Sequence, residues 1–79
     1  MRDFRIGNLA FTAKIERIGE DPLLFTVSDL YPSFQGHTAF LFRYDDQQGT
    51  LAPFGAPEGM GRFVDDLGTI VKDTFPDDF

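Results

Sequence analysis

The chain has 79 residues, 42% of them hydrophobic and 15% aromatic, and its 13 acidic and seven basic side chains give a formal net charge of −6. A chain of this length forms one domain and buries too small a share of its surface to enclose a large pocket. Its apolar content is that of a folded domain rather than a disordered one, so we expect a single domain over residues 1–79.

The chain has no Cys, which excludes a disulfide-stapled domain and a metal site built on thiolates. No apolar run approaches the roughly 18 residues that a membrane-spanning helix needs, and no apolar signal segment follows Met1. We therefore expect a cytoplasmic protein that does not contact a membrane and is held together by packing alone.

The first part of the chain predicts an antiparallel pair of strands. Phe4–Ile6 is a short apolar stretch before a Gly-Asn pair that allows a turn or a bulge. Over Leu9–Glu16 apolar and polar residues alternate with a period of two, as in a half-buried strand. After a turn at Gly19–Pro22 the alternation resumes over Leu23–Ser28, which indicates the antiparallel partner of the first clear strand.

Two more strands are predicted after a longer connection at residues 29–36. His37–Tyr44 has the strongest pattern, and bulky residues on both of its faces indicate a central position. A polar turn at residues 45–49 leads into Thr50–Phe54, which is expected at an edge because its proline would cost a central strand a hydrogen bond. The predicted sheet spans about residues 4–54.

One amphipathic helix is predicted over about residues 59–75. Pro57 and Glu58 suit its first turn, and Pro76 ends it, which leaves a short acidic tail at residues 76–79. Polar residues fall on one side of this helix and should face water. Its apolar side chains recur at helical spacing and form one stripe that the sheet must cover: Met60, Phe63, Val64, Leu67, Ile70, Val71 and Phe75.

The order of these elements predicts an α+β fold, an antiparallel β-meander of about four strands with one C-terminal amphipathic helix packed on one face. A single helix covers only one side of the sheet. Apolar residues such as Leu24, Ala39 and Leu41 are therefore expected on a partly protected face. A homodimer formed through that face is one hypothesis that follows.

The topology also predicts where the acidic residues gather. Alternate turns of a meander lie at the same end of the sheet, so the acids of the first turn should lie beside those of the third. A helix packed antiparallel to the last strand returns toward those turns with the acids of the tail, and its dipole adds negative charge there. Three basic residues, Arg17, Arg43 and Lys72, are expected nearby and weaken the field.

Acidity restricts the class of partner. Lys and Arg side chains supply most of the affinity of a protein for phosphate, so direct binding of nucleic acid is not expected of this chain. Basic protein surfaces are its natural partners, and spaced carboxylates on a compact body can imitate a phosphate track. The alternative interpretation is that acids simply favour solvated turns.

No pattern in the chain indicates catalysis, a metal or a cofactor. His37 is the single imidazole and is expected to be an ordinary half-exposed residue. The adjacent acids of residues 45–46 and 65–66 point apart in a strand or helix, so shared-proton chemistry is not implied. Neither a phosphate-binding nor a dinucleotide-binding fingerprint is present, and residues 45–49 lack the alternating ligands of an EF-hand. We therefore expect a protein that is not an enzyme.

The ending Asp77-Asp78-Phe79 resembles the partner-docking tip of bacterial single-stranded-DNA-binding proteins. In such a tip the ring fills a pocket and the carboxylates meet a basic rim. The alternative for these residues is a frayed tail.

In length, acidity, predicted meander-plus-helix pattern and lack of an active-site motif, the chain resembles the small phage-encoded anti-CRISPR proteins, in particular those that mimic DNA. The resemblance implies a non-enzymatic inhibitor in the cytoplasm of a bacterial host. Such an inhibitor binds the basic nucleic-acid-binding surface of a defence complex, for example a CRISPR effector, and blocks its binding of target DNA. The residues then expected to contact basic side chains of the partner are Glu20, Asp21, Asp45, Asp46, Asp65, Asp66, Asp73, Asp77 and Asp78.

Two other functions stay open at this point. An antitoxin or immunity-type protein that neutralises a basic nuclease would use the same acidic surface. A small dimerisation or adaptor domain would instead use the aromatic sheet face that the helix leaves uncovered.

Overall fold

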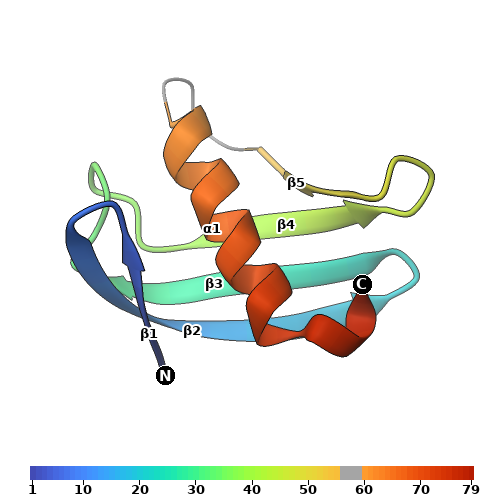
Figure 1. Cartoon of the computed structure of the whole chain (residues 1–79), viewed down its shortest axis with the longest axis horizontal. Coiled ribbons are helices and arrows are strands. Elements are labelled where there is room, and N and C mark those ends of the chain that lie inside the picture. Colours follow the sequence, from blue (N-terminus) through green and yellow to red (C-terminus); the bar gives the residue numbers. More distant parts are fainter. Residues whose placement is uncertain (56–59) are drawn as a thin grey trace.

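Five antiparallel strands follow one another in the chain and pair in the same order, as the computed structural model shows (Figure 1). The structure describes residues 1–55 and 60–79. The α+β class and the antiparallel meander are thus confirmed. The strands are β1 (Arg2–Ile6), β2 (Leu9–Glu20), β3 (Leu23–Tyr31), β4 (Phe40–Asp45) and β5 (Thr50–Pro53).

The predicted count of about four strands was wrong, because the short apolar stretch at the start is a strand of its own. Phe4 pairs with Phe11 across β1 and β2, and their rings stack with centroids 5.8 Å apart. Gly7 adopts a φ of 63°, a conformation that costs glycine little, so the chain reverses within two residues. The added strand makes β1, rather than β2, one edge of the sheet.

The loop before β4 has structure of its own, so β4 begins at Phe40 instead of His37. Within this loop the backbone groups of Phe34 and His37 bond to each other in both directions, at 3.0 and 2.8 Å. This small turn takes up residues that the sequence pattern assigned to the strand. His37 consequently lies on an exposed loop.

Two irregularities between β2 and β3 bend the sheet. The register shifts once between Thr12 and Lys14 and again between Arg17 and Gly19. Such bulges increase the local twist and bend the strand that carries them. The result is a curled sheet in which β1 folds up beside the helix (Figure 1). The curl gives the sheet a concave face that a single helix can fill.

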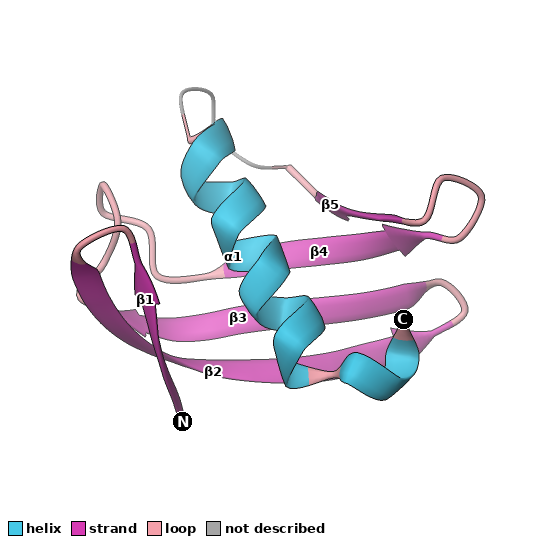
Figure 2. Cartoon of the chain, in the orientation of Figure 1, coloured by secondary structure: helices cyan, strands magenta, loops and turns pink. Residues whose placement is uncertain are grey.

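Helix α1 (Gly61–Thr74) lies across that concave face, steeply inclined to the strands (Figure 2). Its apolar stripe is confirmed, since five of the seven side chains are buried and Ile70 and Phe75 pack partly buried against the same core. The described part of the chain contains no helix with both the length and the apolar character needed to cross a bilayer.

Helix α1 differs from the predicted helix in its direction and in the element that follows it. The predicted start at residue 59 and the first-turn roles of Pro57 and Glu58 lie outside the described residues. It crosses the strands instead of running antiparallel to β5. A short 3₁₀ helix, η1 (Pro76–Asp78), follows α1, so α1 is not the last element of the chain.

Phe63 of α1 is the centre of the aromatic packing. Its ring stacks on that of Phe34 with centroids 3.9 Å apart and planes 3° from parallel. It also contacts Phe11 and Phe40 at 5.6 and 5.8 Å between centroids. These three partners come from the loop before β4, from β2 and from β4 itself. One helical side chain therefore joins three separate segments of the sheet layer.

Gly68 sets how closely α1 approaches the far side of the sheet. A Cβ at this position would lie 3.7 Å from the Phe42 ring and 3.9 Å from the carbonyl oxygen of Leu51 in β5. Both are ordinary van der Waals distances. The site therefore has room for one methyl group and for little more.

We expect Gly68→Ala to raise the free energy of unfolding by about 0.5–1 kcal/mol, because alanine favours the helix and restricts the unfolded chain. Gly68→Leu should lower it by about 1–3 kcal/mol, since the longer side chain must displace Phe42 or β5. Chemical denaturation of the two variants measures both values. A clear loss of stability in Gly68→Ala would contradict the spacing between helix and sheet described here.

Candidate protein-binding surface

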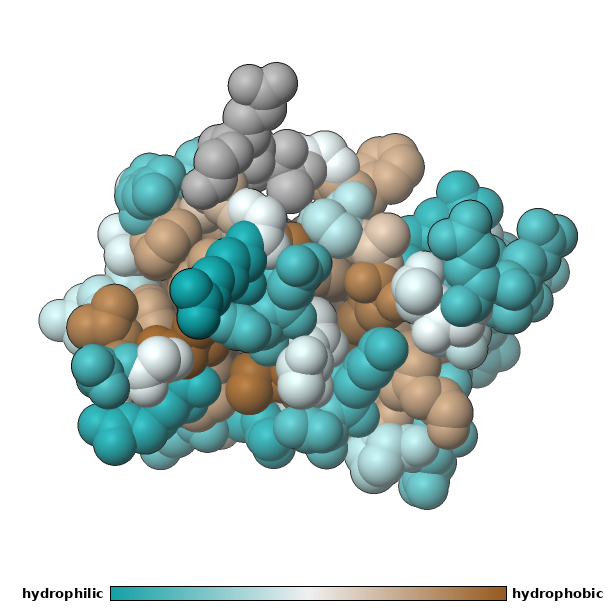
Figure 3. Space-filling view, turned by 45° about the horizontal axis from the view of Figure 1, so that its top comes forward, coloured by the Kyte–Doolittle hydropathy of each residue, from teal (hydrophilic) through white to brown (hydrophobic). Residues whose placement is uncertain are grey.

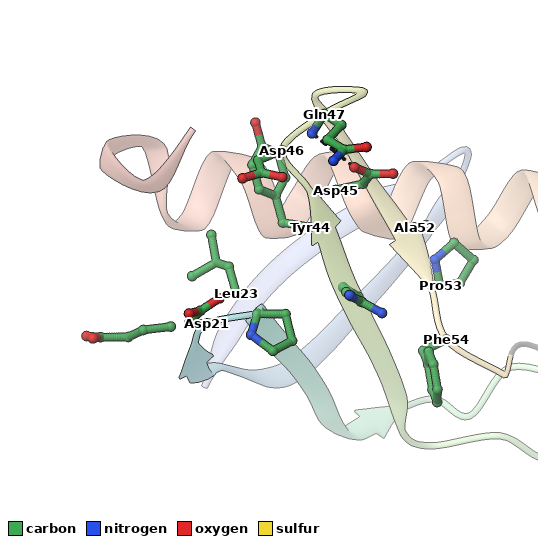
Figure 4. A pocket seen from close by; sticks show the side chains of 12 residues that line it. Asp21, Leu23, Tyr44, Asp45, Asp46, Gln47, Ala52, Pro53 and Phe54 are labelled. Atoms are coloured by element: carbon green, nitrogen blue, oxygen red, sulfur yellow. Dashed lines mark hydrogen bonds between the residues drawn. The ribbon is translucent and has the colours of Figure 1, made fainter.

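The turn after β2 and the turn after β4 project from the same end of the sheet, on the right in Figure 1. Four of the predicted contact residues, Glu20, Asp21, Asp45 and Asp46, line one hollow between these turns. Figure 4 shows Asp21 on the first turn and Asp45 and Asp46 on the other. We call these four residues the acidic end. The meander topology thus brings together carboxylates that are 24 or more positions apart in the sequence.

The hollow at the acidic end is open and partly apolar. Leu23, Tyr44 and Phe54 contribute to its lining, and its volume is roughly 630 Å³. Arg43 also lines it and supplies one positive charge, as expected from the sequence. Hydrophilic side chains gather over this end of the molecule in the space-filling view (Figure 3). A wide, open hollow of this kind suits contact with another protein better than enclosure of a small molecule.

Asp45 of the acidic end also stabilises the turn after β4. Its Oδ1 accepts hydrogen bonds from the backbone N–H groups of Gln47 and Gln48, at 3.0 and 3.4 Å. This is the way in which Asp side chains stabilise turns. Replacing Asp45 would therefore disturb the turn as well as remove a charge. Asp21 and Asp46 are exposed and are the cleaner positions at which to test charge.

The end of the chain comes back to the same region through Arg17. The Arg17 guanidinium lies 3.4 Å from a carboxylate oxygen of Glu20 and 3.9 Å from one of Asp78. Each of these partly exposed pairs contributes little to stability, about 0–1 kcal/mol. These pairs show how the tail is placed, because Arg17 of β2 contacts both Glu20 of the acidic end and Asp78 of η1.

Phe79 also holds the tail against the domain, with its ring 41% exposed. Its ring packs against Phe25 and Tyr44 at 5.4 and 5.1 Å between centroids, and the Lys72 ammonium lies 5.9 Å from its centroid. Phe25 itself is completely buried. The alternative of a frayed tail is therefore wrong, because the ring of Phe79 packs on the core of its own domain. The resemblance of the tail to a docking tip stays a prediction.

The other predicted contact residues lie elsewhere. Asp65, Asp66 and Asp73 are exposed on the helix, and none of them lines the hollow at the acidic end. Asp66 instead lines a separate depression beside Arg62 and the first turn of α1. Asp77 is exposed in η1. The nine acids therefore form one cluster with an adjoining tail and a second group along the helix, rather than a single continuous track.

Among residues 1–55 and 60–79, His, Cys, Asp and Glu side chains do not form a group of three or more that could hold a metal ion. His37 is exposed, and its nearest aromatic contact is Phe40, at 6.3 Å between ring centroids.

A second surface lies on the side of the sheet opposite α1, which we call the outer face. A shallow trough there is lined by residues of β2, β3, β4 and the segments around β5, including Ile18, Thr26, Ala39, Leu41 and Phe54. The expectation that Leu24 and Leu41 would be only partly protected is confirmed, since both are half-buried. Ala39 is exposed.

Comparisons with known protein families, characterised proteins and solved structures found no match for this chain. Its function must therefore be inferred from the two surfaces themselves.

Sequence reasoning missed how the tail is held. It placed Arg17 and Lys72 near the acidic end only as charges that weaken the field, but Arg17 pairs with Asp78 and Lys72 lies over Phe79. One signal was available in the sequence. Phe79 follows Phe75 by four positions at the end of the apolar stripe, and the rings of both residues contact Phe25 in the structure.

We expect Phe79→Ala to lower the free energy of unfolding by about 1–2 kcal/mol, because the buried part of the ring is lost and Phe25 becomes exposed to water. Thermal or urea unfolding at low protein concentration measures the change. Phe54→Ala is the matched control, because Phe54 is 64% exposed, and it should stay within about 0.5 kcal/mol of the parent chain. Equal effects of the two variants would show that the tail does not dock in solution.

Proposed function

We propose that the chain is a non-enzymatic inhibitor that binds a basic protein surface which otherwise holds nucleic acid. The observation that supports this proposal most directly is the acidic end, where carboxylates of two separate turns surround one open hollow. Carboxylates presented on a rigid body can occupy the positions in which a basic groove expects phosphates. They would then block that groove by occupation rather than by chemistry.

The charge balance of the region supports the same proposal. Four carboxylates line the hollow and Asp78 lies close by, against Arg43 in the lining and Arg17 beside it. The excess of negative charge is therefore local as well as global. Because such a surface attracts its partner over a distance comparable to the Debye length, association should be fast at low salt and should weaken as salt increases.

The resemblance to DNA-mimicking anti-CRISPR proteins makes a CRISPR effector in the cytoplasm of a bacterial host the first target to test. A basic nuclease neutralised by an antitoxin or immunity-type protein would meet the same surface. The inhibitor and the antitoxin hypotheses differ only in which protein the acidic end binds.

The first experiment is a pull-down with tagged protein from nuclease-treated bacterial lysate that contains active CRISPR effectors, washed at low and then at high salt. We expect a nucleic-acid-binding complex to be retained at low salt and released at high salt, because counter-ions screen contacts between exposed charges. A partner that resists high salt would contradict binding through the acidic end.

A pair of charge-matched variants tests the site itself. Asp21→Lys with Asp46→Lys should weaken retention of the partner about tenfold or more, since both carboxylates become repulsive ammonium groups at the acidic end. Within the described chain neither side chain takes part in a hydrogen bond or an ion pair, so the fold should be preserved.

The control carries the same change of charge on the helix, Asp65→Lys with Asp66→Lys. If the acidic end is the contact surface, the control should keep most of its binding. If both double variants lose binding equally, net charge rather than the acidic end is responsible, and the proposed site is wrong.

A further inference from the structure

The outer face carries an apolar trough bordered by two exposed side chains. Ile18 of β2 is 55% exposed, and Phe54, directly after β5, is 64% exposed. Because β2 and β5 lie on either side of β3 and β4, these two side chains flank a floor that includes Thr26 and Leu41. Two copies of such a surface, related by a twofold axis, can interlock when one ridge of each enters the trough of the other.

Charge on this face favours a second copy as the occupant. The chain as a whole carries a net charge of −6, so two copies repel each other over most of their surfaces. The strand positions that face outward are an exception, because their charges balance. Alternation along β2 and β4 places two basic and two acidic residues there: Lys14, Arg43, Glu16 and Asp45.

Lys14 and Glu16 add complementarity of their own. They are two positions apart on β2, and their side-chain charges lie 3.6 Å from each other. Both side chains are about half exposed. Across a twofold axis, the Lys14 of one copy can meet the Glu16 of the other, and the reverse pair forms at the same time.

From shape and charge we propose that a second copy of this chain covers the outer face in an isologous dimer. One apolar ridge of each copy, that of Ile18, packs into the trough of the other. The exposed carboxylates of Asp21 and Asp46 lie in turns beyond the strands, so the dimer presents two acidic ends. A target with two basic sites would then be held at both, which strengthens binding without any new contact. The dimer does not depend on the proposed function.

Sedimentation of the full chain from micromolar to millimolar concentration tests the dimer. The mass should rise with concentration toward twice the 8.9 kDa of one chain. Ile18→Glu should raise the dissociation constant about tenfold or more, because it places an unpaired charge in an apolar contact. Leu9→Glu is the matched control, since Leu9 is 56% exposed but lies on the helix side, and it should leave dissociation unchanged.

An NMR dilution series on the unmodified chain locates the contact. Concentration-dependent shifts should concentrate at outer-face residues such as Thr26, Ser28 and Leu41 and should spare the exposed side of α1. A chain that stays monomeric up to millimolar concentration overturns the proposal. So do shifts confined to the helix or the acidic end, or equal weakening by the two Glu variants.

Discussion

The structure depends on the contact between the apolar stripe of α1 and the concave face of the sheet. A five-stranded sheet with large apolar residues on one face is unstable in water until that face is covered. Here a single helix covers it, and Phe63 makes the central contact by packing against rings from β2, from β4 and from the loop between β3 and β4. The bulges between β2 and β3 make this possible, because a flat sheet would be too wide for one helix.

The acidic end is a consequence of the meander topology. In a meander every second turn lies at the same end of the sheet, so polar residues that suit turns accumulate there. Repulsion among the carboxylates is tolerated because they are exposed to water, where screening is strong, and because Arg17 and Arg43 lie among them. The fold therefore presents a concentrated negative charge at little cost in stability. An inhibitor that competes with nucleic acid requires such a surface.

The two candidate surfaces differ in physical character. The acidic end combines charge with a wide hollow, which favours a basic partner and binding that depends on salt. The outer face has balanced charge and two exposed apolar ridges, which favours a partner of the same kind and binding that resists salt. Because Phe54 borders both, a dimer through the outer face would bring part of its interface near the acidic end.

The sequence by itself determined the alternation of β2, β3 and β4, the apolar stripe of α1 and the pairing of the two acidic turns, because each depends on local periodicity or on the rules of a meander. Only the tertiary structure decided the rest. The segment around Phe4 is a strand because it pairs with β2, where Phe4 lies opposite Phe11. The bulges that curl the sheet are set by pairing between strands, so α1 crosses the strands obliquely and leaves Asp65, Asp66 and Asp73 away from the hollow. The position of Phe79 on Phe25 likewise depends on a contact between residues more than fifty positions apart, and the spacing of Phe75 and Phe79 alone does not name the partner.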